Sequence, residues 1–220
     1  MPETIAQRYR RLRAEVPPNV AIVAVTKFQP LEAVLEAIAA GVTDVGENYV
    51  QEARSKFAAA GDVRKHFIGH IQTNKAKAIA ATFDVVQSVD RVEAAAALDK
   101  AAASVGKRLP VLLQINISPA ERFGCDPERA PRLAEELRTF EHLQFEGVMA
   151  IGPISSERAD IQRAFDLAQR VHRSVGGSTL SIGMSGDWAE AVAAGSTMIR
   201  VGSTIFGPRP ARPASKNAAT

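Results

Sequence analysis

The stretch "VAIVAVTKFQPLEAVLEAIAAG", residues 20–41, has the pattern of a complete strand–turn–helix unit. Its opening residues are all apolar and largely β-branched, which is typical of a strand that runs through a protein core. Lys27 follows this run, and Pro30 then opens a segment whose apolar residues recur at helical spacing as far as Gly41, a common type of helix C-cap. An unbroken apolar strand joined directly to a helix indicates an α/β fold.

The same order of strand and helix recurs through the rest of the chain. Strand-like segments are expected at residues 20–25, 43–46, 65–69, 84–88, 110–118, 144–151, 179–183 and 197–202. Helical patterns separate most of them, and an additional amphipathic helix over residues 5–16 precedes the first. Eight such β/α units, in about the smallest length that can hold them, predict a single (β/α)8 TIM-type barrel with an extra N-terminal helix. The alternative is an open doubly wound sheet, and the count of eight favours the barrel.

The composition is that of one soluble globular domain. The chain has 220 residues, of which 46% are hydrophobic and 23% charged, so one sizeable core can form and nothing argues for two. The sequence contains no apolar run of the about 18 residues that span a bilayer, and its N-terminus lacks the apolar segment of a secretory signal. The single cysteine, Cys125, cannot form an internal disulfide. We therefore expect a cytoplasmic protein that does not bind a membrane.

The excess positive charge is confined to the C-terminus. The formal net charge is +3, and residues 208–220 contain Arg209, Arg212 and Lys216 but no acidic side chain. The rest of the chain is thus neutral by count, which argues against a surface that binds nucleic acid. We expect residues 1–207 to form the barrel domain and residues 208–220, rich in proline and alanine, to be a disordered basic tail.

Polar side chains gather where the expected strands end. In a barrel of this type, the loops after the C-terminal ends of the strands form the active face. The residues just past the strands include Lys27, Glu47, Asn48, His70, Gln72, Ser88, Asn116, Ser118, Arg200 and Ser203. Turns of small residues also follow the last strands. The sequence therefore predicts a polar rim that holds a binding or catalytic site.

Two of these turns and one lysine indicate the chemistry of the rim. The turns "MSGD", residues 184–187, and "RVGS", residues 200–203, follow the last two strands, where barrels commonly hold a phosphate with backbone N–H groups. Such turns also often only cap a helix. A lysine at a strand end is usually solvated, but Lys27 held against apolar walls would supply the neutral amine that Schiff-base formation requires. A phosphate site that faces such a lysine suggests a phosphorylated aldehyde, with pyridoxal phosphate as the obvious candidate.

Two further patterns argue less for a site. His66 and His70 have the i, i+4 spacing of a metal pair, but that spacing aligns two ligands only on a helix, and their segment is expected to be a strand that leads into a loop. The motif "GMSGD", residues 183–187, lacks the glycine spacing of a nucleophile elbow, and no histidine follows it in the sequence. A metal site and a hydrolase are therefore not expected.

Several blocks of the sequence resemble a known family. They are "AVTKFQP", "VGENYVQE", "HFIGHIQTNK", "GVMAIGP", "LSIGMSGDW" and "AAGSTMIRVGSTIFG", spread from about residue 20 to residue 207. In content, order and spacing they are similar to the signature blocks of the pyridoxal phosphate homeostasis proteins, often called the YggS or PROSC family. The resemblance implies the barrel of the alanine racemase N-terminal domain, pyridoxal 5'-phosphate (PLP) as cofactor, and no established catalytic turnover.

The resemblance also implies a role for each matching residue. Lys27 would form the covalent aldimine with PLP, and Asn48 would lie near the cofactor ring. Arg200 would face the pyridine nitrogen, and the phosphate would be held by Ser185, Gly186, Gly202 and Ser203. A guanidinium that is always charged cannot accept a proton, so it would keep the ring nitrogen unprotonated and make the ring a poor electron sink. No residue is assigned a catalytic role.

Three functions compete at this point. The resemblance implies a protein that holds PLP and buffers or delivers it inside the cell, with PLP-dependent apoenzymes as candidate recipients. An amino-acid racemase of the same fold needs a second acid–base group opposite Lys27, and we expect racemase-type activity to be weak or absent because neither Tyr9 nor Tyr49 can be placed there. A cofactor-free aldolase would leave Arg200 without an evident task. We expect a monomer that is not an enzyme.

Overall fold

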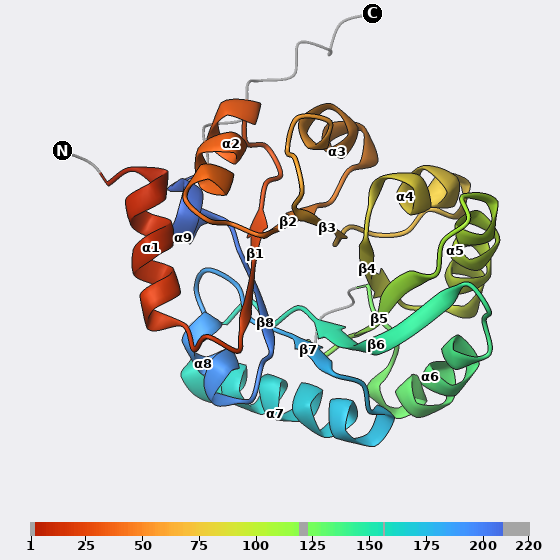
Figure 1. Ribbon diagram of the computed structural model, residues 1–220. Helices are drawn as coiled ribbons and strands as arrows, with labels where there is room; N and C mark the ends of the chain where they lie inside the picture. Colours follow the sequence, from red (N-terminus) through yellow and green to blue (C-terminus); the bar gives the residue numbers. More distant parts are fainter. Residues whose placement is uncertain (1–2, 119–122, 156, 209–220) are drawn as a thin grey trace, which may run out of the picture.

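The computed structural model describes residues 3–118, 123–155 and 157–208. Its strands are β1 (Ala21–Val25), β2 (Asp44–Glu47), β3 (Arg64–Phe67), β4 (Val85–Val89), β5 (Leu109–Ile115), β6 (Leu143–Ala150), β7 (Thr179–Ser181) and β8 (Met198–Val201). The strands pair in sequence order, and β8 pairs in parallel with β1 to close the barrel (Figure 1). The predicted (β/α)8 barrel is therefore confirmed, and the open doubly wound sheet is wrong.

Helices cover the outside of the barrel (Figure 1). They are α1 (Ile5–Glu15), α2 (Leu31–Ala39), α3 (Val50–Phe57), α4 (Ala76–Thr82), α5 (Val92–Ser104), α6 (Ala130–Arg138), α7 (Arg158–Val175), α8 (Trp188–Ala193) and α9 (Ser203–Phe206), with 3-10 turns η1 (Thr73–Lys75) and η2 (Pro127–Arg129). Parallel neighbouring strands need such crossover connections, because the chain must return to the same end of the sheet before each new strand begins.

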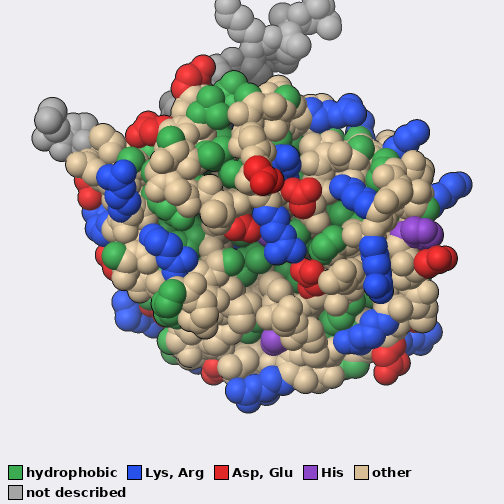
Figure 2. All heavy atoms as spheres, in the orientation of Figure 1, with side chains coloured by type: hydrophobic (Ala, Val, Ile, Leu, Met, Phe, Trp, Pro, Cys, Tyr) green, Lys and Arg blue, Asp and Glu red, His purple; other side chains and the backbone are tan. Residues whose placement is uncertain are grey.

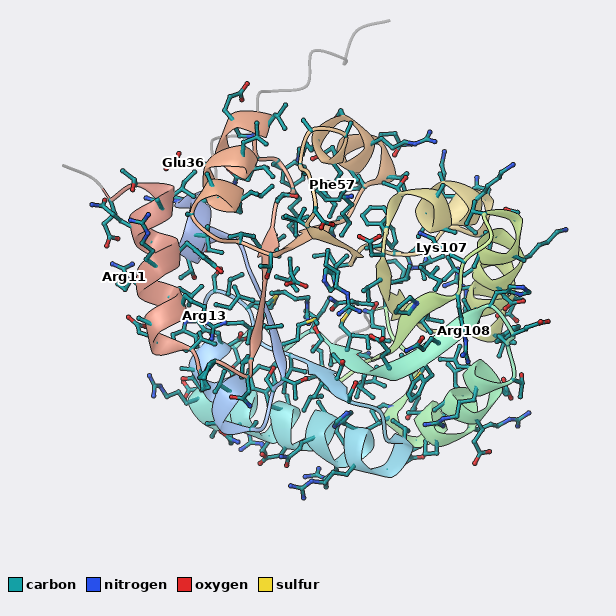
Figure 3. The ribbon with its side chains drawn as sticks, in the orientation of Figure 1. Arg11, Arg13, Glu36, Phe57, Lys107 and Arg108 are labelled. Atoms are coloured by element: carbon teal, nitrogen blue, oxygen red, sulfur yellow. The ribbon has the colours of Figure 1, made fainter. Side chains whose placement is uncertain are left out.

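The extra N-terminal helix α1 is tied to both ends of the barrel chain. Its Arg13, labelled in Figure 3, donates to the carbonyl oxygen of Val20 at 2.9 Å, just before β1. Its Arg8 donates to the carbonyl oxygen of Ile205 in α9 at 2.6 Å. Helix α1 therefore fastens the segment that enters the first strand to the helix that follows the last strand.

Several strands end earlier than the sequence predicts, by two or three residues in β3, β5 and β7. Strand β5 stops at Ile115 rather than residue 118, because the N–H of Asn116 turns to the carbonyl oxygen of Cys125 at 2.9 Å. Strand β7 stops at Ser181 rather than residue 183, and Gly183 has φ +96°, a left-handed conformation that begins the following turn. In both β5 and β7 the predicted strand extends into the loop that forms the polar rim.

The surface carries both signs of charge. Figure 2 shows Lys and Arg side chains mixed with Asp and Glu side chains across the visible face. Among the described residues, no helix combines the length and apolar character needed to cross a bilayer. The predicted basic tail, residues 208–220, lies outside the described residues apart from Pro208.

The interior of the barrel is not purely apolar. Side chains from the strands fill it (Figure 3), and aliphatic residues are among them, as is usual in such barrels. Polar side chains are nevertheless buried among them, including His66, Gln87, Ser181 and Arg200. Buried polar groups are stable only when they are hydrogen-bonded, so each must have partners inside the barrel.

Candidate functional site

A cavity of about 240 Å³ opens at the C-terminal ends of the strands. All the residues that the sequence assigns to a cofactor line this one cavity, namely Lys27, Asn48, Ser185, Gly186, Arg200, Gly202 and Ser203. Apolar side chains, among them Val25, Ile68 and Met149, form the rest of the wall. These seven residues thus converge on one mixed polar and apolar site, which is the composition of a small-molecule cavity.

A second, larger cavity of about 950 Å³ lies beside the first. Asn48, Ile68 and Ile151 line both cavities. Three other predicted rim residues, His70, Gln72 and Asn116, line the larger cavity and not the smaller one. The side chains past the strands therefore divide between two adjoining spaces.

Lys27 lies in a tight turn directly after β1. The turn is closed by the N–H of Gln29, which donates to the carbonyl oxygen of Thr26 at 3.0 Å. Phe28 has φ +63°, the only left-handed conformation of a non-glycine residue among the described residues. Such backbone strain persists only where the surroundings impose it, and it is concentrated at functional sites. The half-buried Lys27 side chain lines the cavity from this turn.

A buried ion pair supports this turn. The Nζ atom of Lys56 in α3 lies 2.7 Å from Oε1 of Glu47, which is fully buried at the end of β2. Lys56 also donates to the carbonyl oxygen of Thr26 at 2.8 Å, and the other oxygen of Glu47 accepts from the N–H of Asn48 at 3.0 Å. The pair therefore fixes the backbone beside Lys27 and the backbone of Asn48 together. The position of Glu47 at a strand end predicts its place on the rim, whereas nothing in the sequence indicates that Lys56 supports the site.

Arg200 projects from β8 and is 5% exposed. Its Nη1 donates to the carbonyl and hydroxyl oxygens of Ser181, both at 2.7 Å, and its Nη2 donates to the carbonyl oxygen of Ala150 at 2.8 Å. Burial lowers the pKa of Arg200 to about 10, an effect that the nearby carboxyl of Asp187 opposes. The guanidinium is therefore still charged at neutral pH and is held in one orientation at the cavity wall.

The two small-residue turns meet at Ser185. Its Oγ accepts from the N–H of Gly202 at 3.1 Å and from the N–H of Thr204 at 3.3 Å, at the start of α9. Two backbone N–H groups thus converge on one oxygen position beside the cavity, which is the arrangement that binds phosphate oxygens. A Cβ atom added to Gly186 would meet no atom within 4 Å, so the space above this turn is open.

These residues fit pyridoxal phosphate. The cavity offers a lysine amine for an aldehyde, a buried guanidinium for a ring nitrogen and backbone N–H groups for a phosphate. His66 and His70, by contrast, do not face one another. His66 is buried in the barrel, whereas His70 is exposed and stacks on Phe123 with ring centroids 3.9 Å apart.

The chain matches one family model over nearly its whole length. The model describes the alanine racemase N-terminal domain and covers residues 2–210. The pyridoxal phosphate homeostasis protein of Pseudomonas aeruginosa is 40% identical over 218 residues, which are 94% of this chain and 95% of that protein. The protein of the same name from Escherichia coli K12 is 37% identical over 207 residues, 88% of this chain and 87% of the relative.

Solved structures agree with this likeness. PipY of Synechococcus elongatus with PLP bound has a TM-score of 0.87 and 36% identity, and the match covers 93% of this chain and 100% of PipY. Alanine racemase from E. faecalis has a TM-score of 0.80 at 16% identity, over 94% of this chain and 58% of the racemase. The racemase shares the fold alone, because its identity is so low.

Proposed function

This chain belongs to the pyridoxal phosphate homeostasis protein family, and we propose that it holds PLP in the 240 Å³ cavity through Lys27. In this function the protein stores PLP in the cytoplasm and releases it to PLP-dependent apoenzymes, without catalytic turnover. The observation that supports it most is the convergence of Lys27, Arg200 and the two phosphate turns on one cavity. The related PipY structure with PLP bound supports the same cofactor.

The chain's own residues divide the work of binding. When bound, PLP supplies an aldehyde that condenses reversibly with a lysine amine. Lys27 would provide that amine from the wall of the cavity, and Ser185, Gly186, Gly202 and Ser203 would hold the phosphate at the two small-residue turns. Arg200 donates hydrogen bonds and cannot accept a proton, so it keeps a ring nitrogen in its unprotonated form. Such a site retains the cofactor and disfavours carbanion chemistry.

A racemase is the second candidate, and the fold shared with alanine racemases favours it. Racemisation requires a second acid–base group opposite the lysine. Among the described tyrosines, Tyr9 uses its hydroxyl to donate to the carbonyl oxygen of Gly41 at 3.0 Å, and Tyr49 lines the larger cavity and is 51% exposed. Prolonged incubation of the protein with alanine, followed by chiral analysis, separates the candidates. Inversion above that of free PLP would support the racemase.

The absorption spectrum tests the proposed site. Purified protein should show the visible band of lysine-bound PLP, and Lys27→Ala should abolish it. The control is Lys75→Ala, because Lys75 lines only the larger cavity. A colourless wild type that takes up no PLP by mass spectrometry, or a Lys27→Ala protein that keeps the band, would contradict the proposal.

Delivery and oligomeric state are tested separately. Protein loaded with PLP should restore the activity of a PLP-dependent apoenzyme when the two are mixed directly. An equal concentration of Lys27→Ala in PLP-depleted buffer should restore that activity more slowly. Sedimentation equilibrium should give the mass of one 23.5 kDa chain, since we propose a monomer. A stable dimer mass would contradict that part of the proposal.

A further inference from the structure

A line of hydrogen-bonded polar side chains crosses the barrel interior from β2 to β8. Nε2 of His66 lies 2.9 Å from Oδ1 of Asp44, and Nδ1 of His66 lies 2.8 Å from Nε2 of Gln87. The hydroxyl of Ser181 donates to Oε1 of Gln87 at 2.7 Å and accepts from Nη1 of Arg200 at 2.7 Å. We call these five residues the interior chain. It joins Arg200 in β8, at the wall of the cofactor cavity, to Asp44 at the start of β2.

The interior chain has one consistent set of donors and acceptors. Arg200 can only donate, and an ionised Asp44 can only accept, so with a neutral His66 imidazole these ends fix the direction of every bond between them. A reversed amide of Gln87 would set its oxygen against Nδ1 of His66. The imidazole would then carry its proton on that nitrogen and present a bare Nε2 to the carboxylate of Asp44. The arrangement observed is therefore the one that satisfies all members.

The interior chain is largely buried, so it lowers the free energy of unfolding unless each of its polar groups has a hydrogen-bond partner. His66, Gln87 and Ser181 are each 0% exposed. Each would lose hydration without compensation if one partner were removed, because water does not reach these buried side chains. Burial also lowers the pKa of His66, which keeps the imidazole neutral and able to accept from Gln87. Aliphatic side chains at these positions would be enough to form the barrel. Stability of the fold therefore does not explain why the interior chain is polar.

We propose that Gln87 and Ser181 are positioning residues that hold the guanidinium of Arg200 in the orientation needed at the cofactor cavity. The hydroxyl of Ser181 donates its hydrogen bond to Gln87, so its oxygen lone pairs stay directed toward Arg200 and accept from the guanidinium. Without Gln87 the hydroxyl can rotate and direct its proton toward the guanidinium. The part of the proposal that concerns PLP rests on the proposed function, since it takes the ring nitrogen as the partner of Arg200.

Two variants cut the interior chain at different points. Gln87→Met keeps the length of the side chain and removes its hydrogen bonds to both His66 and Ser181. Ser181→Ala removes only the hydroxyl next to Arg200 and leaves the Ser181 carbonyl oxygen in place. The matched control is Ser196→Ala. Ser196 is also a buried serine beside β8, and its hydroxyl lies 2.8 Å from the carbonyl oxygen of Ile182, outside the interior chain.

The first measurement uses PLP binding and the spectrum of the bound cofactor. We expect Gln87→Met to weaken PLP binding about tenfold and Ser181→Ala several-fold, since each loosens a hydrogen bond to a charged group. The pH at which the absorption band of the bound cofactor changes should shift in both variants. Ser196→Ala should change neither quantity. Folded variants that bind PLP with the wild-type affinity and spectrum would overturn the proposal.

The second measurement needs no cofactor. Imidazole ¹⁵N NMR of the apo-protein should find the proton of His66 on Nε2 and a hydrogen bond at Nδ1. Gln87→Met should remove that hydrogen bond and move the Nδ1 resonance, whereas Ser196→Ala should not. An unchanged Nδ1 resonance in Gln87→Met would overturn the interior chain itself. A wild type that binds no PLP but shows this NMR behaviour would refute the proposed function while keeping the interior chain, and Ser181→Ala carries the test if Gln87→Met does not fold.

Discussion

Lys56 and Glu47 form a salt bridge of 2.7 Å whose side chains are 10% and 0% exposed. The pair joins α3 to the end of β2, and the hydroxyl of Thr26 also donates to Glu47 at 3.1 Å. Thr26 directly precedes Lys27, the lysine that lines the cofactor cavity. The position of the predicted cofactor lysine thus depends on a buried charge pair that does not itself line the cavity.

Removing one half of this pair should destabilise the protein strongly. Lys56→Met leaves the carboxylate of Glu47 buried without its counter-charge, and such a change typically costs about 3–5 kcal/mol of unfolding free energy. The double variant Glu47→Leu with Lys56→Met should recover part of that loss, because it removes the buried charge of Glu47 as well, and Glu52, the second partner of Lys56 at 3.0 Å, is 32% exposed to water. Urea denaturation of the apo-proteins gives these free energies.

An exposed ion pair provides the control for this experiment. Arg132 and Glu136 lie one helical turn apart in α6 with 3.0 Å between them, and the Arg132 side chain is 87% exposed. Arg132→Ala should leave the unfolding free energy nearly unchanged, because water screens such pairs. If Lys56→Met were as mild as Arg132→Ala, the pair would not support the Lys27 turn.

The sequence predicts the rim better than the residues that support it. Lys27 and Arg200 are recognisable because each stands at a strand end beside turn residues, and strand ends of a parallel barrel meet on one rim. Lys56 lies on the face of an ordinary helix, and Gln87 is one of two adjacent polar residues in the short strand β4. Their partners become evident only when the barrel closes, since Gln87 and Ser181 are 94 positions apart in the sequence.

Gly183 should not tolerate a side chain. Its φ is +96°, and a Cβ atom there would lie 2.5 Å from Cβ of Ala191 and 3.2 Å from Cα of Trp188. Gly183→Ala should therefore cost about 2–4 kcal/mol, since overpacking adds to the backbone strain. Gly106→Ala separates the two effects, because Gly106 has φ +67° and a Cβ atom added there would meet nothing within 4 Å. Thermal or urea unfolding should show the Gly106 variant to be clearly the milder.

Cys125 should be unreactive in the folded protein. Burial, followed by the charges of Asp90 and Asp126, raises the pKa of its thiol to about 12. The thiolate is the nucleophile, so at pH 8 very little of the reactive form is present. Iodoacetamide should modify the folded protein far more slowly than the urea-unfolded chain at the same pH. Equal rates in the two states would contradict this environment of Cys125.

The buried histidine should make folding sensitive to mild acid. Burial lowers the pKa of His66 below its ordinary value of 6.5, so the unfolded chain takes up a proton at pH 5–6 that the folded protein does not. The free energy of unfolding should therefore fall as the pH drops from 7 to 5, by at most about 1.4 kcal/mol per pH unit for this group. His66→Gln should flatten the slope, because glutamine does not titrate and can still donate to Asp44. Burial lowers the pKa of His172 in the same direction, so His172→Gln should remove a further part. A His66→Gln slope equal to that of the wild type would mean that folding leaves the pKa of His66 unchanged. The imidazole would then take up its proton inside the barrel as in the unfolded chain, and the hydrogen bond from Gln87 to its Nδ1 would be lost in mild acid.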